Sequence, residues 1–187
     1  ASTERISGIV RELRGFSRTD DERRPVDLGA VLTSAERMTE SALRARARVI
    51  RSERRAPLVW GNAGRLEQVF VNLLLNAAQA MPSLRVEDNA ISIDIGEDGD
   101  TVLVEVSDNG VGIASEHLPR IFDPFFTTKP TGHGLGLAAV LGIVRAHGGG
   151  LRVRPSPGSG ATFEVILPST SAPARVPAVQ SPPHASL

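Results

Sequence analysis

The chain has no cysteine and no tyrosine among its 187 residues. Without cysteine it can form no disulfide, no thiolate zinc site and no cysteine nucleophile. No apolar run in the sequence approaches the roughly 20 residues of a membrane-spanning helix. Charged side chains interrupt the first apolar residues, which is not typical of a secretory signal. We therefore expect a cytoplasmic location and no membrane contact from this segment.

Neither sign of charge is in excess, because 21 basic residues balance 21 acidic ones. A balanced chain has no overall field that attracts nucleic acid, and its basic residues are not interleaved with aromatic ones, so no nucleic-acid partner is expected. Lysine is scarce: the basic residues are 20 arginines and one lysine, Lys129. A bias in base composition explains the scarcity of lysine, but it does not explain the position of Lys129.

Hydrophobic residues make up 41% of the chain, which is enough for one ordinary globular core. We expect three parts. Residues 1–24 hold a short amphipathic helix, Ile6 to Phe16, followed by a charged stretch before Pro25. Residues 25–168 form the main domain. Residues 169–187 are rich in proline, alanine and serine, and their few apolar side chains predict a disordered tail or linker.

Hydrophobic periodicity predicts the elements of the main domain. The expected helices are Leu28 to Ala45, Asn62 to Met81 with Asn62 as N-cap and Pro82 as the stop, and about Leu135 to Gly148. The expected strand segments are Val49–Arg51 and Pro57–Trp60 around a charged turn, a hairpin of Ala90–Gly96 and Val102–Val106, and a hairpin of Leu151–Arg154 and Ala161–Leu167. This pattern indicates an α+β two-layer sandwich, in which a mixed, mostly antiparallel sheet carries helices on one face.

Two segments carry polar side chains that could bind a ligand. Asn72 and Asn76 lie four residues apart on an expected helix, so both amides can reach one ligand, and amide oxygens suit Mg²⁺. Two solvated or capping amides are the simpler interpretation. Asp108 ends a valine-rich strand and could accept from an exocyclic amine such as that of adenine, while Gly110 and Gly112 allow a flat ligand close to the backbone. The alternative is an ordinary hairpin loop, although no compatible strand follows within hairpin distance.

Two further segments are rich in phenylalanine or glycine. The phenylalanines between Phe122 and Phe126 could form a satellite core beneath a loop, and the polar residues after them could form a mobile cover whose Lys129 meets phosphate. Residues 132–137 read G-H-G-L-G-L at the start of a helix, where backbone N–H groups and the helix dipole bind phosphate. This motif alone is weak, because it matches neither the Walker loop nor the dinucleotide fingerprint. The order of all four segments is highly specific.

The four histidines form no i, i+4 metal pair. His117 lies in a polar loop, His147 near a helix C-terminus and His184 in the expected tail, and we expect each of them to be a surface or capping residue. His133 lies within the glycine loop and is the one histidine expected to contact a ligand.

Taken in order, these segments closely resemble the catalytic and ATP-binding domain of bacterial sensor histidine kinases, a GHKL ATPase with the Bergerat fold. N-L-L-L-N-A-A-Q-A-M resembles the N box of that family, D-N-G-V-G-I the first glycine box, F-D-P-F-F-T-T-K the F box, and G-H-G-L-G-L-A-A-V the second glycine box. G-S-G-A-T-F-E-V-I-L-P resembles the closing strand hairpin. The match covers roughly Asp27 to Pro168, and five motifs in the right order exceed what chance similarity produces.

The resemblance implies a role for each matching position. Asn76 would hold Mg²⁺, Asn72 would support the metal and the phosphates, and Asp108 would accept from the adenine amino group with Thr162 near the base. Lys129 and the backbone amides around Gly134 to Gly136 would contact phosphates beneath a lid that spans roughly Ser115 to His133. The implied nucleotide-binding residues are Asn72, Asn76, Gln79, Asp108, Gly110, Gly112, Ile113, Phe122, Lys129, Gly132, His133, Gly134, Leu135, Gly136, Leu137 and Thr162.

Two positions depart from the family pattern. Related hydrolytic ATPases carry a water-activating glutamate four residues before the metal-binding asparagine, where this chain has Asn72. Without that base, bound ATP is expected to be hydrolysed slowly and kept for phosphoryl transfer. Many family members carry lysine or arginine three residues after the metal-binding asparagine, where this chain has Gln79, so more of the phosphate contact would depend on Lys129.

The expected function is that of the catalytic domain of a two-component sensor histidine kinase, which transfers the γ-phosphate of Mg·ATP to a histidine. Residues 1–24 are expected to be a remnant of the second helix of the dimerisation and phosphoacceptor domain and of the linker after it, because Ile6 to Arg18 resemble only the last turns of that helix. We therefore expect no catalytic residue and no acceptor histidine in this fragment. The implied partners are that phosphoacceptor domain, in cis or in trans, and the receiver domain of a response regulator. The alternatives are a degenerate domain that acts as a protein-interaction switch and a slow GHKL ATPase.

Overall fold

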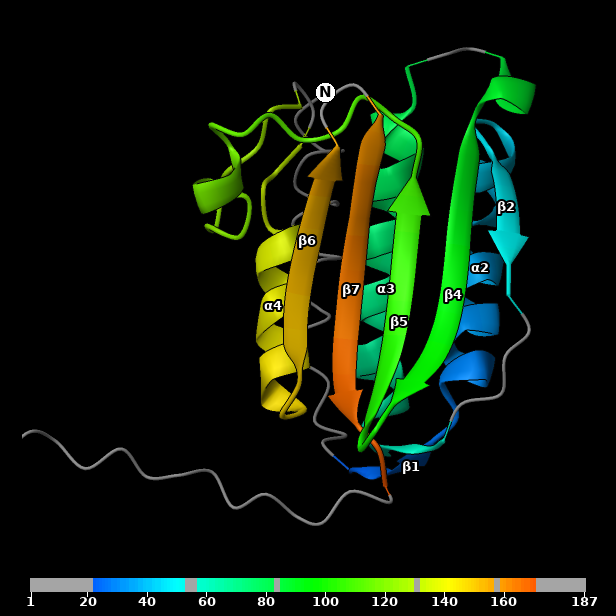
Figure 1. Cartoon of the computed structure of the whole chain (residues 1–187), viewed down its shortest axis with the longest axis vertical. Coiled ribbons are helices and arrows are strands. Elements are labelled where there is room, and N and C mark those ends of the chain that lie inside the picture. Colours follow the sequence, from blue (N-terminus) through cyan, green and yellow to red (C-terminus); the bar gives the residue numbers. More distant parts are fainter. Residues whose placement is uncertain (1–21, 53–56, 83–84, 130–131, 157–158, 171–187) are drawn as a thin grey trace, which may run out of the picture.

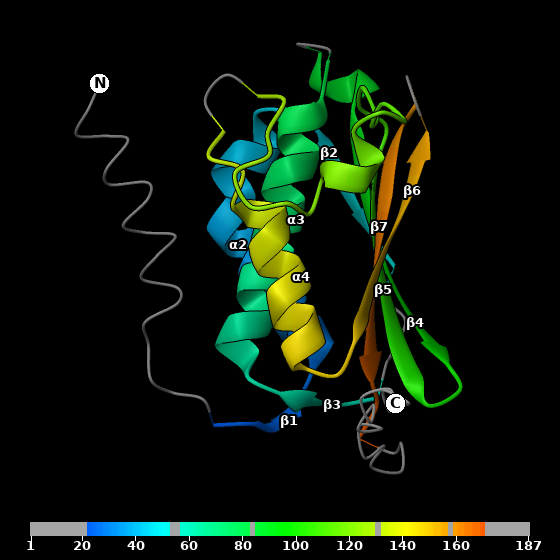
Figure 2. The same ribbon diagram turned by 90° about the vertical axis from the view of Figure 1, so that its left-hand side faces the viewer.

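The computed structural model describes residues 22–52, 57–82, 85–129, 132–156 and 159–170. The helix expected between Ile6 and Phe16 and the chain beyond Thr170 lie outside the described residues. The described part has two layers, a five-stranded sheet and helices packed on one of its faces (Figure 2). This arrangement confirms the predicted α+β two-layer sandwich.

The main sheet has the strand order β2-β4-β5-β7-β6 (Figure 1). Its strands are β2 (Arg48–Arg51), β4 (Ala90–Asp98), β5 (Thr101–Asp108), β6 (Gly150–Ser156) and β7 (Gly160–Pro168). Both predicted hairpins are confirmed, because β4 pairs antiparallel with β5 and β6 pairs antiparallel with β7. β5 and β7 also pair antiparallel, whereas β2 runs parallel to β4, so the sheet is mixed and mostly antiparallel.

The two strand segments beside the charged turn do not pair with each other. β2 joins the main sheet, while β3 (Val59–Gly61) pairs antiparallel with β1 (Arg24–Val26) in a separate two-stranded sheet. The sequence does not predict β1, because three residues that include Pro25 are too few to show a period of two. Beyond β7, the N–H of Thr170 donates to the carbonyl of Leu58 at 2.7 Å.

Side chains cap the starts of α2 (Leu28–Arg44) and α3 (Ala63–Ala80), and a glycine follows the end of α4 (Gly136–Ala146). α2 begins after Asp27, whose Oδ1 accepts from the N–H of Gly29 at 2.8 Å. α3 begins after Asn62, the predicted N-cap, whose side chain accepts from the N–H of Arg65 at 2.9 Å. α4 ends shortly before Gly148, whose φ of +71° suits glycine. Two short 3₁₀ helices, η1 (Val86–Asp88) and η2 (Leu118–Arg120), lie in the connections.

The core fills the space between the sheet and the helices. Alternate strand residues face the helices, as the pattern of Ile91, Ile93 and Ile95 predicts, and these side chains are at most 2% exposed. α3 lies in the middle of the helix layer, between α2 and α4 (Figure 1). Its predicted apolar stripe is buried, namely Leu66, Val69, Phe70, Leu73, Leu74, Ala77 and Met81. This burial fixes the rotation of α3 and thereby the direction of its polar face.

Among the described helices, not one combines the length and the apolar character that crossing a bilayer requires.

Candidate functional site

A cavity of about 500 Å³ lies where α3, the end of β5, the following loop and the start of α4 meet. Most of the residues predicted for the nucleotide site line this cavity: Asn72, Asn76, Gln79, Asp108, Gly112, Ile113, Lys129, Gly132, His133, Gly134, Leu135, Gly136 and Leu137. The structure therefore brings together four segments that are up to 65 residues apart in the sequence. Gly110, Phe122 and Thr162 do not line it.

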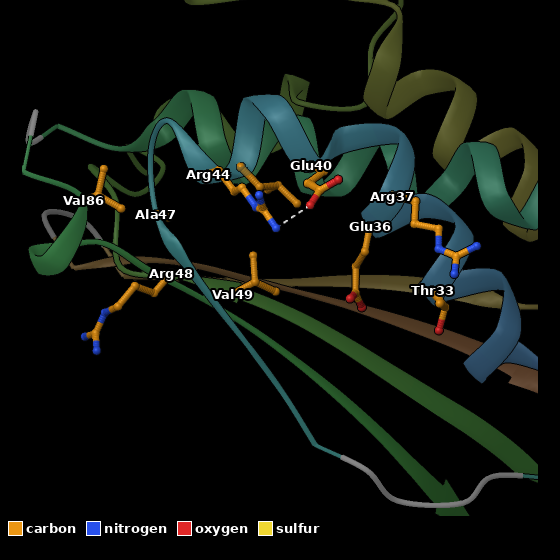
Figure 3. A pocket seen from close by; sticks show the side chains of 10 residues that line it. Thr33, Glu36, Arg37, Glu40, Arg44, Ala47, Arg48, Val49 and Val86 are labelled. Carbon is orange, nitrogen blue, oxygen red and sulfur yellow. Dashed lines mark ion pairs between the residues drawn. The ribbon is translucent and has the colours of Figure 1, made fainter.

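A second hollow, of about 620 Å³, lies between α2 and β2 (Figure 3). Charges of both signs line its walls, among them Glu40 and Arg44, which pair at 2.6 Å. Although this hollow is larger, none of the predicted site residues lines it, and its rim charges are solvent-exposed and largely offset one another. We therefore assign the functional site to the cavity beside α3.

The amide side chains of α3 form one wall of the cavity. The Nδ2 of Asn72 donates to the carbonyl of Gly136 at 3.5 Å, so Asn72 connects α3 to the first turn of α4. The Oδ1 of Asn76 and the Oε1 of Gln79 both accept from the Nζ of Lys129, at 3.2 and 2.8 Å. Amide oxygens are hard, uncharged ligands, so the donor set around Asn76 fits a magnesium ion that completes its shell with water and phosphate.

Lys129 brings positive charge into this cavity. Burial lowers the pKa of Lys129, and the negative charge of Asp108 opposes that shift. Among the described residues that line the cavity, Lys129 is the only lysine or arginine. A bound polyphosphate would therefore draw its charged side-chain contact from this residue.

Asp108 lies at the end of β5, and its carboxylate faces the cavity. Its Oδ1 accepts from the N–H of Gly110 at 2.9 Å. Burial raises the pKa of Asp108, while hydrogen bonds from the backbone of Gly110 and Ala161 and the charge of Lys129 act in the opposite direction. A carboxylate in such partly desolvated surroundings is a strong acceptor, which suits recognition of an exocyclic amine.

Two predicted residues support the site from outside the cavity. A Cβ at Gly110 would lie 2.5 Å from the carbonyl oxygen of Ala80, and the N–H of Val111 donates to that oxygen at 3.0 Å. Glycine at position 110 therefore lets the loop after Asp108 dock onto the end of α3. Phe122 packs against the main hydrophobic core, as does Phe126, whereas Phe125 is 75% exposed, so these phenylalanines do not form a separate satellite core.

The structure does not bring Thr162 to the cavity, contrary to its expected place near the base. Its hydroxyl hydrogen-bonds the hydroxyl of Ser107 at 2.8 Å on the sheet face that carries no helices. Ala161 and Phe163, its neighbours in β7, line the cavity instead. The reason is strand alternation: Phe163 faces the helices, so Ala161 shares its face and Thr162 points away. The sequence pattern contained this signal, because Phe163, Val165 and Leu167 alternate.

The second glycine box forms the start of α4 and the loop before it. The N-cap residue of α4, Leu135, makes no side-chain capping hydrogen bond, so the first N–H groups of the helix can bind an anion. Gly134 has φ +68°, and its carbonyl accepts from the N–H of Phe125 at 2.8 Å. A Cβ at Gly134 would collide with the backbone of Phe125, so this glycine permits the contact between the F box and the glycine loop.

Several residues that were not predicted to contact the nucleotide also line the cavity. They include Phe126, Thr127 and Thr128 of the F box, and His117, which was expected to be a surface or capping residue. The ring of His117 lies 5.7 Å from that of Phe126, over which the guanidinium of Arg120 lies at 4.7 Å. All are in or beside the lid region implied by the resemblance, which was the available signal. His147 is the C-cap of α4 as expected, but it is buried rather than on the surface.

The fold and the composition of this cavity are those of an ATP-binding domain. Residues 61–171 match the family described as "Histidine kinase-, DNA gyrase B-, and HSP90-like ATPase". The chain belongs to this family, and the resemblance inferred from the sequence motifs is confirmed.

Similar proteins are sensor histidine kinases. The chain is 45% identical over 112 residues to the sensor histidine kinase ZraS of Escherichia coli (strain K12), covering 60% of this chain and 23% of that protein. It is 34% identical over 187 residues to the sensory histidine kinase/phosphatase NtrB of Rhizobium leguminosarum bv. phaseoli, covering 90% of this chain and 47% of that protein. The chain therefore spans less than half the length of either relative.

Solved structures show the same fold. The catalytic domain of histidine kinase ThkA superposes with a TM-score of 0.68 at 28% identity, covering 79% of this chain and 96% of that one. The mycobacterial sensor histidine kinase MprB superposes with a TM-score of 0.67 at 28% identity, covering 79% of this chain and 98% of that one. Both likenesses support the assignment of the main domain to this ATPase class.

Proposed function

We propose that this chain is the Mg·ATP-binding catalytic domain of a two-component sensor histidine kinase, and that it delivers the γ-phosphate to a histidine on another domain. One observation carries the proposal: the amides of α3, the carboxylate of Asp108, Lys129 and the uncapped start of α4 surround one cavity. The names of the relatives support the kinase branch of the family.

Each group has a role that follows from its chemistry. Asp108 accepts from the adenine amino group, with Gly112 and Ile113 beside the base. Asn76 holds Mg²⁺, which when bound neutralises phosphate charge, and Asn72 supports that end of the site. Lys129 and the first N–H groups of α4 bind the phosphates, and His133 and Leu135 lie in the same glycine loop. The protein thus contributes positioning and electrostatic stabilisation, the two main needs of phosphoryl transfer.

Hydrolysis of the bound nucleotide is expected to be slow. Asp108 is the only carboxylate among the described residues that line the cavity, and it is hydrogen-bonded to the Gly110 loop. No carboxylate on α3 faces the cavity, because Asn72 occupies the corresponding position. Without a general base for water, ATP persists until an acceptor arrives.

The acceptor histidine comes from outside the ATP-binding domain. His117 and His133 line the nucleotide cavity, and His147 is buried against α3, so none of the three is placed to be presented to another active site. The proposed partners are a dimerisation and phosphoacceptor domain, of which residues 1–24 are the proposed remnant of the second helix and linker, and the receiver domain of a response regulator. Residues 25–168 hold the proposed catalytic unit, which the structure extends to Arg24 through β1 and to Thr170 through backbone hydrogen bonds of Ser169 and Thr170. The remaining residues up to 187 are the proposed tail or linker, and the proposed location is the cytoplasm.

Three measurements test this function. Calorimetry with ADP and Mg²⁺ should give a micromolar to millimolar Kd, and a folded chain that binds no nucleotide would contradict the proposal. Mixing the chain with [γ-³²P]ATP and an added phosphoacceptor domain from a relative should label that domain on histidine. Sustained phosphate release in the absence of any acceptor would favour a hydrolytic ATPase instead.

A further inference from the structure

Lys129 bridges two parts of the cavity wall. Its Nζ donates to the Oε1 of Gln79 at 2.8 Å and to the Oδ1 of Asn76 at 3.2 Å. Its backbone is held as well: its N–H donates to the hydroxyl of Thr127 at 3.1 Å, and its carbonyl accepts from the N–H of Gly132 at 3.1 Å. The side chain therefore joins the segment from Phe126 to Lys129 to the middle of α3.

On its cavity face, α3 provides oxygen acceptors for the ammonium group of Lys129 and carries no positive charge of its own. No basic residue lies in the last turn of α3, and Arg65, in its first turn, does not line the cavity. The cationic group at the amide face of α3 consequently comes from another segment, some 50 residues away in sequence. A cation that arrives on a loop can leave with that loop, whereas one carried on α3 could not.

The Oδ1 of Asn76 has two possible cationic partners. This oxygen accepts from Lys129, and it is also the atom that fits Mg²⁺ in the proposed function. An ammonium at 3.2 Å and a metal at about 2.1 Å from the same oxygen would lie within about 5 Å of each other. Two cations at that distance in a partly desolvated cavity repel each other strongly.

We propose that Lys129 and Mg²⁺ compete for the Oδ1 of Asn76, so that Lys129 latches the Phe126–Lys129 segment to α3 until a metal–nucleotide complex takes that oxygen. Gln79 is the positioning residue: its Oε1 keeps the ammonium beside the phosphates after Asn76 has been released. Mg²⁺ binding and the movement of this segment are thereby coupled. The inference rests on the proposed function and describes how the same site is regulated.

The test compares ADP binding to the full chain in excess Mg²⁺ and in excess EDTA by calorimetry. The Kd in EDTA divided by the Kd in Mg²⁺ measures how much Mg²⁺ strengthens binding. Lys129→Met removes the competitor, so this ratio should rise about fivefold or more, a typical size for coupling between sites. If Lys129 only attracted phosphate, this ratio would also rise in Lys129→Met, because no metal neutralises the phosphates in EDTA, so the second variant, Gln79→Ala, separates the two roles. An unchanged ratio in Lys129→Met would overturn the latch.

A second variant should change the ratio of the two dissociation constants in the opposite direction. In Gln79→Ala the ammonium retains Asn76 as its acceptor on α3, so it competes with Mg²⁺ more strongly and the ratio should fall below that of the wild type. A ratio above the wild-type value would overturn the proposal. Arg48→Met, which removes a positive charge from a residue of β2 that does not line the cavity, is the matched control and should leave both constants unchanged.

These outcomes separate the latch from the function on which it rests. A wild-type chain that binds ADP in neither condition contradicts the proposed function itself. A wild-type chain that binds Mg·ADP, combined with unchanged ratios in both variants, contradicts only the latch. Circular dichroism of each variant should match the wild type, because Lys129 and Gln79 lie outside the hydrophobic core.

Discussion

The Nε2 of His147 accepts a hydrogen bond from the backbone N–H of Asn62 at 3.1 Å. Because Nε2 is the acceptor, the hydrogen of the neutral ring lies on Nδ1 and is donated to the carbonyl of Ile143 at 2.8 Å. One buried side chain thus joins the end of α4 to the start of α3. These two helices carry the glycine box and the amide face, so this joint fixes both walls of the nucleotide cavity relative to each other.

Gly61→Ala tests the joint between the helices. A Cβ at Gly61 would lie 2.6 Å from the Cδ2 of His147, too close for the imidazole to keep its position. We expect the free energy of unfolding in urea to fall by about 1–3 kcal/mol, as for other overpacked sites. Gly142→Ala is the matched control, because it lies in α4 with nothing within 4 Å of an added Cβ. It should gain about 0.5–1 kcal/mol from helix propensity, and equal losses in both variants would contradict the prediction.

Asp108→Asn should separate nucleotide affinity from stability. The asparagine can still accept from Gly110, but it loses the charge that strengthens a hydrogen bond to the adenine amine. Loss of one charge-assisted bond corresponds to about a 10- to 100-fold weaker Kd for ADP, measured by calorimetry. An unchanged Kd would refute the role of Asp108.

The difference in Tm between the wild type and Asp108→Asn should depend on pH, and this dependence tests the electrostatics of the cavity. Burial raises the pKa of Asp108, so the folded state binds a proton more readily than the unfolded state does. The resulting stabilisation is complete below the ordinary pKa of about 3.9 and is lost as the pH rises through the raised value. Relative to Asp108→Asn, the wild type should therefore gain in Tm as the pH is lowered through this window. A difference in Tm that does not depend on pH would contradict the shift.

Substitution by valine at two neighbouring residues of β7 should have different effects on the Kd for ADP. Thr162→Val removes a hydroxyl that bonds Ser107 outside the cavity, so the Kd for ADP should stay within about twofold of wild type. Ala161→Val adds two methyl groups to the cavity wall beside Asp108 and should weaken ADP binding by about tenfold or more. Calorimetry of the two variants decides between the position inferred from the motif and the one seen in the structure, and a loss of affinity in Thr162→Val alone would favour the former.

Gly134→Ala should damage the phosphate end of the cavity without unfolding the domain. Its φ of +68° costs a non-glycine residue about 1–2 kcal/mol, and the new Cβ would press on the backbone of Phe125. The start of α4 would then lose its alignment, so ADP affinity should fall by about tenfold while the near-ultraviolet and far-ultraviolet spectra remain native. Gly142→Ala again serves as the control, with wild-type affinity expected, and an equal loss in both variants would exclude a specific effect.

Several features of this protein were determined by the sequence alone. The apolar stripe of α3, the N-cap Asn62, the two hairpins and the ordered motifs can all be inferred from residues that are close together in the chain, because helix and strand periods are local properties. The same locality allowed most of the nucleotide-site residues to be named, since each motif places its side chains relative to its own helix or loop.

Tertiary structure decided the rest. The parallel pairing of β2 with β4 and the small sheet of β1 and β3 depend on contacts between distant segments, which short strands do not encode in their own pattern. The orientation of Thr162 depends on which face of the sheet the helices cover. The position of Lys129 on Asn76 and Gln79 exists only after α3 and the loop have packed together, because a hydrogen bond across 50 or more residues requires the fold that brings its two ends within about 3 Å.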